Sequence, residues 1–115
     1  MTKYNDGRRF EWKVRDDLTA QGYDVIRSAG SKSKVDLLAF KPGQVLLVQV
    51  KRKPGALAPA ERMELLRLAA LLPTVALPVQ AYQPAPRRPI AYAVLTGPGP
   101  RDRRPWMPDE VASCT

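Results

Sequence analysis

Three polar residues interrupt two otherwise apolar segments of the sequence. The segment 34–40 reads KVDLLAF and the segment 45–52 reads VLLVQVKR, so the interruptions are Asp36, Gln49 and Lys51. A carboxylate and an amide oxygen together suit a hard cation such as Mg²⁺ or Mn²⁺. An ammonium group beside that cation can steady an attacking water molecule. These residue types therefore favour metal-assisted hydrolysis.

The turn between the two segments predicts how close these residues come. Residues 41–44 read Lys-Pro-Gly-Gln, which suits a tight turn between antiparallel strands. If Phe40 lies opposite Val45, the same register places Asp36 opposite Gln49, with Cβ atoms about 5 Å apart. Because side chains alternate along a strand, Lys51 lies on the same face as Gln49. The hairpin thus predicts that the three polar groups converge.

Each of these residues also has a simpler interpretation. Asp36 alone suits the start of a strand, and Gln49 and Lys51 alone suit a solvated face. Taken together, that interpretation is weaker, because the apolar run predicts a buried environment for Gln49. A buried unpaired polar group costs several kcal/mol without compensation.

The composition narrows the possible chemistry and the possible partners. No histidine is present, which excludes His-based acid–base catalysis and His-containing zinc sites, and the one cysteine, Cys114, cannot form an internal disulfide. The 115 residues suit one domain, and their net charge of +8 favours nucleic acid as partner, ahead of an anionic membrane surface. No apolar run reaches the ~20 residues of a membrane span, and the first residues lack a signal-peptide core. We expect a cytoplasmic protein.

The periodicity of the chain predicts two helices and five strands. Phe10, Val14 and Leu18 recur at helical spacing, which predicts a helix over 5–21 that Gly22 ends. Pro78 places the fourth strand near a sheet edge. The remaining expected elements are a strand at 23–29, a basic loop at 30–34, the hairpin strands 35–40 and 45–50, a helix at 60–72 opened by Pro59, and strands at 74–82 and 90–96.

Two parts of this order carry further expectations. The helix at 60–72 has leucines on more than one face, which suggests a partner surface. The domain is expected to cover residues 1–97. Residues 98–115 form a Pro/Arg-rich tail without periodicity, which we expect to be extended or mobile unless something binds it.

The two hairpin segments resemble the two halves of the PD-(D/E)xK nuclease motif. The segment 7–14, GRRFEWKV, supplies the upstream helical glutamate of that motif. Within the superfamily, residues 5–97 most resemble archaeal and phage Holliday junction resolvases. The resemblance implies a restriction-endonuclease-like αβββαββ domain of the α/β class, with a central mixed sheet flanked by helices. It also implies a homodimer that cleaves four-way DNA junctions with Mg²⁺, for which Mn²⁺ substitutes.

The resemblance assigns roles residue by residue. Asp36 takes the place of the metal-binding aspartate, and Lys51 takes that of the lysine that orients the attacking water. Glu11 matches an acid that binds the metal directly or through water. Ser31, with Ser28 as the weaker candidate, matches a loop serine near the scissile phosphate. Arg8 and Arg9 match phosphate-positioning groups.

One position departs from the family pattern. Gln49 stands where the motif has an acid, two residues before the lysine. Glutamine offers the metal a carbonyl oxygen without charge, so the site has two carboxylates where the pattern has three. We therefore expect weaker metal binding, with Asp36, Gln49 and Glu11 as the metal-binding set.

Basic residues flank the expected site in the sequence, where a DNA backbone would have to pass. Generic solubility is their alternative role. The residues expected to bind DNA are Arg8, Arg9, Arg27, Lys32, Lys34, Arg52 and Lys53. The aromatic Trp106, Tyr82 and Tyr92 suit base stacking less well than packing.

Three other functions remain open at this level. The first is a less selective PD-(D/E)xK nuclease of restriction, repair or DNA-processing type. The second is a branched-DNA-binding module whose site has decayed at Gln49 and no longer cuts. The third, a basic RNA-binding protein, leaves the Asp36, Gln49 and Lys51 cluster unexplained.

Overall fold

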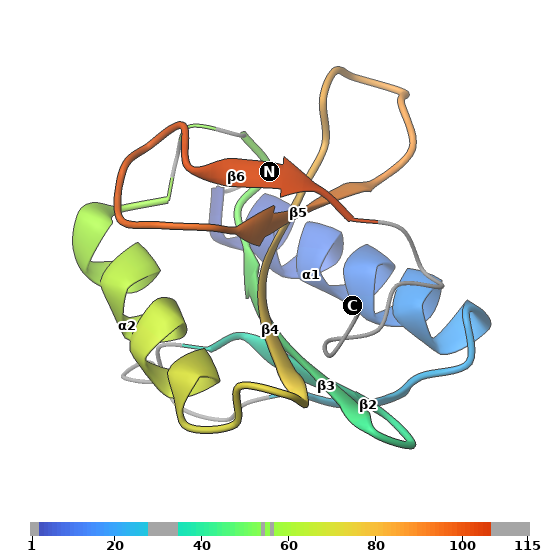
Figure 1. Cartoon of the computed structure of the whole chain (residues 1–115). Coiled ribbons are helices and arrows are strands. Elements are labelled where there is room, and N and C mark those ends of the chain that lie inside the picture. Colours follow the sequence, from blue (N-terminus) through green and yellow to red (C-terminus); the bar gives the residue numbers. More distant parts are fainter. Residues whose placement is uncertain (1–2, 28–34, 54, 56, 107–115) are drawn as a thin grey trace.

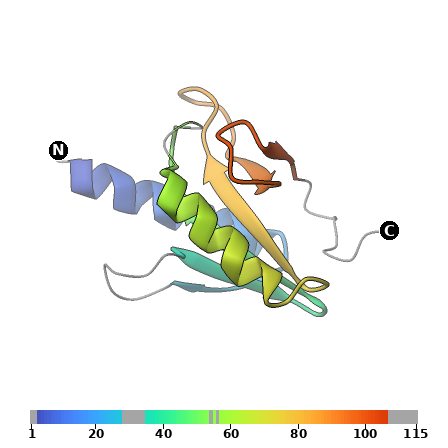
Figure 2. The same ribbon diagram turned by 60° about the vertical axis from the view of Figure 1, so that its left-hand side comes forward.

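The structure, a computed structural model, describes residues 3–27, 35–53, 55 and 57–106, with side chains from Arg9 onward in the first helix. Six strands form one sheet in the order of the sequence, and of their pairings β3 with β4 is parallel and the others are antiparallel. The two helices lie on opposite faces of this sheet (Figures 1 and 2). The elements are α1 (Lys3–Ala20), β1 (Asp24–Arg27), β2 (Leu37–Lys41), β3 (Gln44–Val50), α2 (Pro59–Ala70), β4 (Ala76–Tyr82), β5 (Ala91–Leu95) and β6 (Arg103–Pro105). The predicted α/β fold with a mixed sheet flanked by helices is confirmed.

The strand β3 is covered on both faces. Leu46 and Val48 pack in one cluster with the buried residues of α1, and Leu47 packs in a second cluster with Leu65 of α2. Side chains alternate between the faces of a strand, so Gln49 follows Leu47 toward the α2 side. Coverage by both helices is why a polar residue of β3 becomes buried.

The hairpin of β2 and β3 has the predicted register with a tighter turn. The pairing runs from Leu37 opposite Val48 to Lys41 opposite Gln44, so the turn has two residues where the sequence suggested four. Gly43 occupies the left-handed region at φ 75°, which glycine adopts without strain. The regular pairing ends at Leu37, the residue that follows Asp36 in the chain, so Asp36 itself lies just outside the ladder.

The predicted edge position of Pro78 is wrong, because β4 lies inside the sheet. The carbonyls of Val75 and Ala81 accept hydrogen bonds from the backbone N–H groups of Val45 in β3 and of Lys51, which follows β3. By the alternation of backbone groups, the nitrogen of Pro78 points away from β3. The nitrogen of Pro78 faces β5 instead, and the pairing of β4 with β5 begins one residue later, at Val79. Proline is tolerated there because its missing N–H interrupts no pairing in the ladder.

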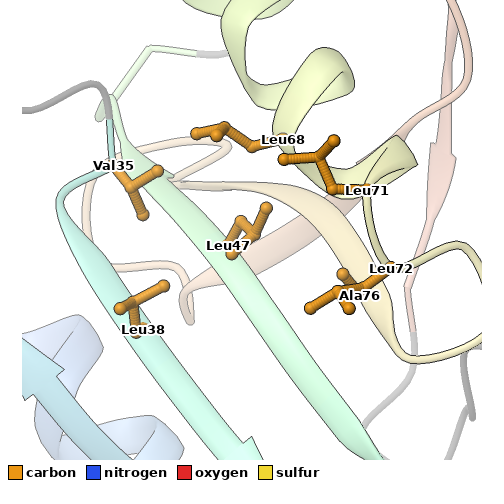
Figure 3. A pocket seen from close by; sticks show the side chains of 7 residues that line it. All are labelled: Val35, Leu38, Leu47, Leu68, Leu71, Leu72 and Ala76. Atoms are coloured by element: carbon orange, nitrogen blue, oxygen red, sulfur yellow. The ribbon is translucent and has the colours of Figure 1, made fainter.

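The end of α2 presents an apolar surface, as the surplus of leucines suggested. Leu65 is buried, whereas Leu71 and Leu72, just after the helix, are exposed. Beside them a pocket of about 380 Å³ opens against the hairpin strands (Figure 3). Its lining residues are Val35, Leu38, Leu47, Leu68, Leu71, Leu72 and Ala76. Of the helices in the described part of the chain, neither is long and apolar enough to cross a membrane.

Part of the expected tail belongs to the fold. β6 pairs with β5, and Trp106, which follows it, is 4% exposed and stacks edge-on against Tyr92 at 5.1 Å between ring centroids. Arg62 of α2 donates hydrogen bonds to the carbonyls of Gly97 and Asp102, which holds the loop before β6. A three-residue strand carries too little periodicity for the sequence to reveal it. Residues 107–115 lie outside the described part of the chain.

We predict that Trp106→Ala lowers the free energy of unfolding by about 3–5 kcal/mol, because it empties a packed position of the main cluster. Trp12→Ala is the matched control, since Trp12 is 43% exposed, and its effect should stay within about 0.5 kcal/mol. Urea denaturation followed by far-UV circular dichroism measures both. Equal stabilities of the two variants would show that residues after Gly97 are dispensable for the fold.

Candidate active site

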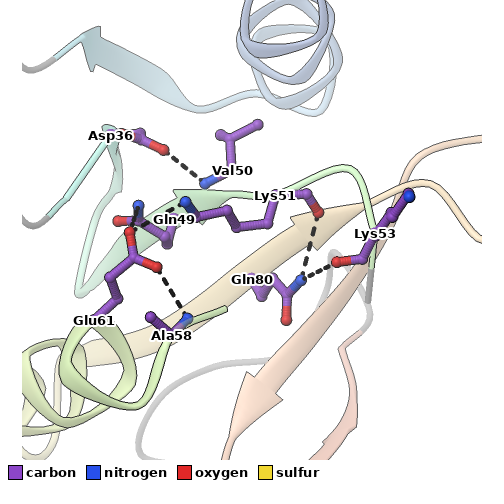
Figure 4. Close-up of polar contacts among 8 residues, drawn as sticks. All are labelled: Asp36, Gln49, Val50, Lys51, Lys53, Ala58, Glu61 and Gln80. Carbon is purple, nitrogen blue, oxygen red and sulfur yellow. Dashed lines mark hydrogen bonds and ion pairs between the residues drawn. The ribbon is translucent and has the colours of Figure 1, made fainter. Parts of the chain in front are cut away.

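Polar side chains from three elements gather where β3 ends (Figure 4). Gln49 lies in β3, and Lys51 directly follows that strand. Asp36 directly precedes β2, and Glu61 lies in the first turn of α2. The predicted convergence of Asp36, Gln49 and Lys51 is therefore present in space. Glu61 joins them as a residue that the sequence analysis did not select.

The backbone holds the Asp36 carboxylate in place. Its Oδ2 accepts the N–H of Val50 at 2.9 Å, and the N–H of Asp36 donates to the carbonyl of Val48 at 3.0 Å. Burial raises the pKa of Asp36 above its usual range, the hydrogen bond from Val50 opposes this, and the nearby charges of Glu11 and Glu61 raise it further. A carboxylate with a raised pKa gains from a neighbouring cation, which stabilises its charged form.

One of the two polar atoms of the Gln49 amide forms a hydrogen bond in the structure. The residue is 5% exposed, and its Nε2 donates to Oε2 of Glu61 at 3.2 Å. Its Oε1 is buried and accepts no hydrogen bond among the described residues. A buried oxygen without a donor is costly, and a bound cation would remove that cost.

Lys51 is held from both ends. Its Nζ forms an ion pair with Oε2 of Glu61 at 3.2 Å, and its backbone N–H donates to the carbonyl of Ala81. The parallel pairing of β3 with β4 thus fixes where the side chain begins, and α2 fixes where it ends. The Lys51 side chain as a whole is 32% exposed.

Glu11 reaches the site electrostatically from α1. Its carboxylate pairs with Arg27 of β1 at 3.2 Å and contributes to raising the pKa of Asp36. Arg27, which the sequence predicted to bind DNA, thus lies in an ion pair with Glu11 in the structure. The two helices bring one acid each to Asp36 from opposite faces of the sheet.

Gln80 of β4 is a further buried polar residue that the sequence analysis missed. It is fully buried opposite Gln49, and its Nε2 donates to the carbonyls of Lys51 and Lys53 (Figure 4). These bonds hold the chain as it leaves β3. The available signal was that Gln80 interrupts an apolar strand in the same way as Gln49.

The basic residues expected to bind DNA are partly described. Arg9, Arg52 and Lys53 are exposed, and the guanidinium of Arg52 lies 5.4 Å from the ring centroid of Phe10. Arg8 lies in α1, but its side chain is outside the described part. Four other residues expected at the site or on its DNA-binding rim fall outside the described residues: Ser28, Ser31, Lys32 and Lys34.

The donor set suits a hard cation. Among the residues that the structure describes, no group of three or more His, Cys, Asp or Glu side chains is placed to hold a metal ion. A metal here would need the amide oxygen of Gln49 together with the Asp36 carboxylate. No group in the described part of the chain donates to that buried oxygen, so the residues present fit a divalent cation with oxygen ligands.

The chain is similar in sequence and in structure to proteins named Hjc. A sequence model of the family described as archaeal Holliday junction resolvase (Hjc) matches residues 2–72, more than half of the chain. The crossover junction endodeoxyribonuclease Hjc of Methanocaldococcus jannaschii is 47% identical over 49 residues, which are 43% of this chain but only 36% of that relative. The solved structure of the Holliday junction resolvase Hjc of Archaeoglobus fulgidus is similar with a TM-score of 0.64 and 25% identity, over 75% of this chain and 74% of that one.

The raised pKa of Asp36 predicts a pH-dependent stability. The folded protein holds this proton more tightly than the unfolded chain, so stability falls as pH rises from the ordinary value of 3.8 through the raised pKa. Asp36→Asn keeps an acceptor for Val50 and should be more stable than the metal-free wild type at about pH 7, with the gap closing in acid. Urea unfolding across this pH range measures it, with exposed Asp16→Asn as the control. A less stable Asp36→Asn at neutral pH would contradict the burial argument.

Proposed function

The chain belongs to the archaeal Holliday junction resolvase family, and from this we propose that it is a structure-selective endonuclease for four-way DNA junctions. It would cut them by metal-dependent phosphodiester hydrolysis, with paired symmetric nicks, in DNA recombination and repair. The observation that carries the proposal is the buried amide oxygen of Gln49, which has no hydrogen-bond donor within residues 3–27, 35–53, 55 and 57–106 and lies in the same cluster as Asp36 and Lys51. The net charge of +8 supports a DNA substrate, and we propose the cytoplasm as the place of action.

Each residue of the site has a proposed part in this reaction. Asp36 and Gln49 would hold Mg²⁺, or Mn²⁺ in its place, with Glu11 close behind. A divalent cation at these oxygens polarises the phosphate and lowers the pKa of a bound water molecule. Lys51 would donate a hydrogen bond to the attacking oxygen and keep it in line. No covalent intermediate with the protein is required.

The surroundings of the site would position the DNA. Arg9, Arg52 and Lys53 are exposed and would bind backbone phosphates, as would Arg27. Arg8, Lys32 and Lys34 are proposed for the same role from the sequence alone. Ser31 likewise remains a proposed contact near the scissile phosphate.

A homodimer would match the symmetry of the substrate. A four-way junction has two-fold symmetry, and two related sites are needed to nick it in pairs. The apolar pocket beside Leu71 and Leu72 is the surface we propose for self-association, because exposed apolar residues of this kind favour protein contacts (Figure 3). The pocket lies on the α2 side of the sheet.

One observation favours a second candidate function. Gln49 brings no negative charge, and a site with weak metal affinity would bind branched DNA without cutting it. In that module, metal would make no difference to the products. A less selective nuclease differs from both, since it would cut linear and branched DNA alike.

We predict that the protein nicks a labelled four-way junction symmetrically with Mg²⁺ or Mn²⁺ and spares a matched linear duplex. Asp36→Ala should lower the nicking rate by at least about 100-fold, because it removes the charged ligand of the metal. EDTA should abolish nicking of the junction by the wild type. Denaturing gels of labelled strands measure the cuts.

The same assay separates the alternatives. Cutting of junction, duplex, flap and single strand at equal rates would indicate the less selective nuclease. Tight junction binding in a gel-shift assay, with no cutting under any metal, would indicate the non-cleaving module. In that case Gln49→Glu should restore metal affinity and cutting if the missing charge is the cause.

The proposed dimer surface makes its own prediction. Leu71→Glu should convert a dimer into a monomer at micromolar concentration, because a charge would be buried in the contact. Met63→Glu is the control, since Met63 in α2 is an exposed apolar residue like Leu71 but does not line the pocket. Sedimentation velocity measures both. A monomeric wild type at that concentration would contradict the dimer.

A further inference from the structure

The carboxylate of Glu61 accepts a hydrogen bond from Gln49, the residue at which the site departs from the family motif. We propose that Glu61 is a positioning residue of the active site, which fixes the amide of Gln49 and the ammonium of Lys51 and supplies from α2 the charge that Gln49 lacks. This inference rests on the proposed function, because it concerns the same site. Glu61 is not one of the motif residues Asp36, Gln49 and Lys51.

One oxygen of Glu61 serves two site residues. Oε2 accepts from Nε2 of Gln49 at 3.2 Å and pairs with Nζ of Lys51, also at 3.2 Å (Figure 4). Gln49 and Lys51 are neighbours on one face of the same chain segment. A single carboxylate that contacts both therefore fixes their side chains relative to each other.

The chemistry of a carboxylate selects the orientation of the Gln49 amide. An ionised carboxylate only accepts hydrogen bonds, so the side of the amide that faces it must be the NH₂ group. The carbonyl oxygen is then turned away from Glu61, and it is this buried Oε1 that has no partner among the described residues. The reversed amide would place two oxygens against each other. Glu61 thus leaves the metal-binding atom of Gln49 available.

The start of α2 holds Glu61 in this conformation. Its second oxygen, Oε1, accepts the backbone N–H of Ala58, the N-cap residue of α2, at 3.0 Å. With both oxygens engaged, the side chain loses little further freedom when a ligand binds. The helix start therefore presents a preorganised charge to the end of β3.

Glu61 also keeps the charge balance of the site. Its charge reaches Asp36, whose carboxylate it disfavours, while Lys51 favours it. The site thus retains a carboxylate near Asp36 although the strand position carries glutamine. Moving that charge from β3 to α2 allows a neutral residue at the buried position 49.

The test compares two glutamates of α2. Glu61→Gln removes the charge but keeps a side-chain oxygen that can accept the N–H of Ala58. Glu64→Gln is the control, since the two side chains are 27% and 26% exposed and each forms an ion pair. We expect Glu61→Gln to weaken Mn²⁺ binding by the DNA-free protein about 10- to 100-fold, as loss of a group that orients metal-binding side chains does, and Glu64→Gln to leave it unchanged. Isothermal titration measures the affinity, and thermal unfolding verifies that both variants fold.

An exchange of the two residues separates positioning from a merely structural role. In the double variant Gln49→Glu with Glu61→Gln, the amide at 61 can donate to the carboxylate at 49, so Mn²⁺ affinity should return at least to the wild-type value. Wild-type affinity in Glu61→Gln, or no recovery in the double variant, would overturn the proposal.

Mn²⁺ binding by Asp36→Ala and nicking of the junction, measured alongside, distinguish a failure of the positioning role from a failure of the proposed function. Loss of Mn²⁺ binding in Asp36→Ala, with wild-type binding in Glu61→Gln, would overturn the positioning role alone. The expected affinities without any junction nicking would support the positioning role and contradict the endonuclease. A wild type that binds no Mn²⁺ would overturn both.

Discussion

The burial of β3 on both faces is the constraint on which the rest of the structure depends. Hydrophobic burial drives the two helices onto opposite sides of this strand, and β4 pairs with it in parallel. Polar groups at its end then lie in a poorly solvated place where each needs a partner. The site is therefore built at the point where the core ends and the polar requirements are strongest.

Those requirements are met by neighbours from separate elements. The backbone of Val50 serves Asp36, Glu61 of α2 serves Gln49 and Lys51, and Gln80 of β4 serves the carbonyls that follow β3. What the network leaves open are buried amide oxygens, among them Oε1 of Gln49. Native proteins rarely leave such atoms unsatisfied without a functional reason. The Oε1 atom of Gln49 is the atom for which we propose such a reason, namely metal binding.

A glutamate from another element lies beside the glutamine of the proposed site. Membership of the family is clear from residues 2–72, and the fold agrees with a solved family member. The glutamine at the motif position lies within hydrogen-bonding distance of a glutamate from the next helix. Electrostatic effects act through space, so a carboxylate can come from any element that the fold brings near.

The sequence by itself determined the hairpin, its register, the two helices and the convergence of Asp36, Gln49 and Lys51, because these follow from local periodicity and one tight turn. Only the tertiary structure decided the placement of Glu61, whose position in the first turn of α2 marks a helix start and says nothing about Gln49, 12 residues earlier in the chain. It also decided the interior position of β4 with Pro78, which depends on where β5 pairing begins, and the pairing of β6, which Trp106 anchors in the core. Local patterns record which backbone each segment prefers, whereas contacts between elements arise only when the core is packed.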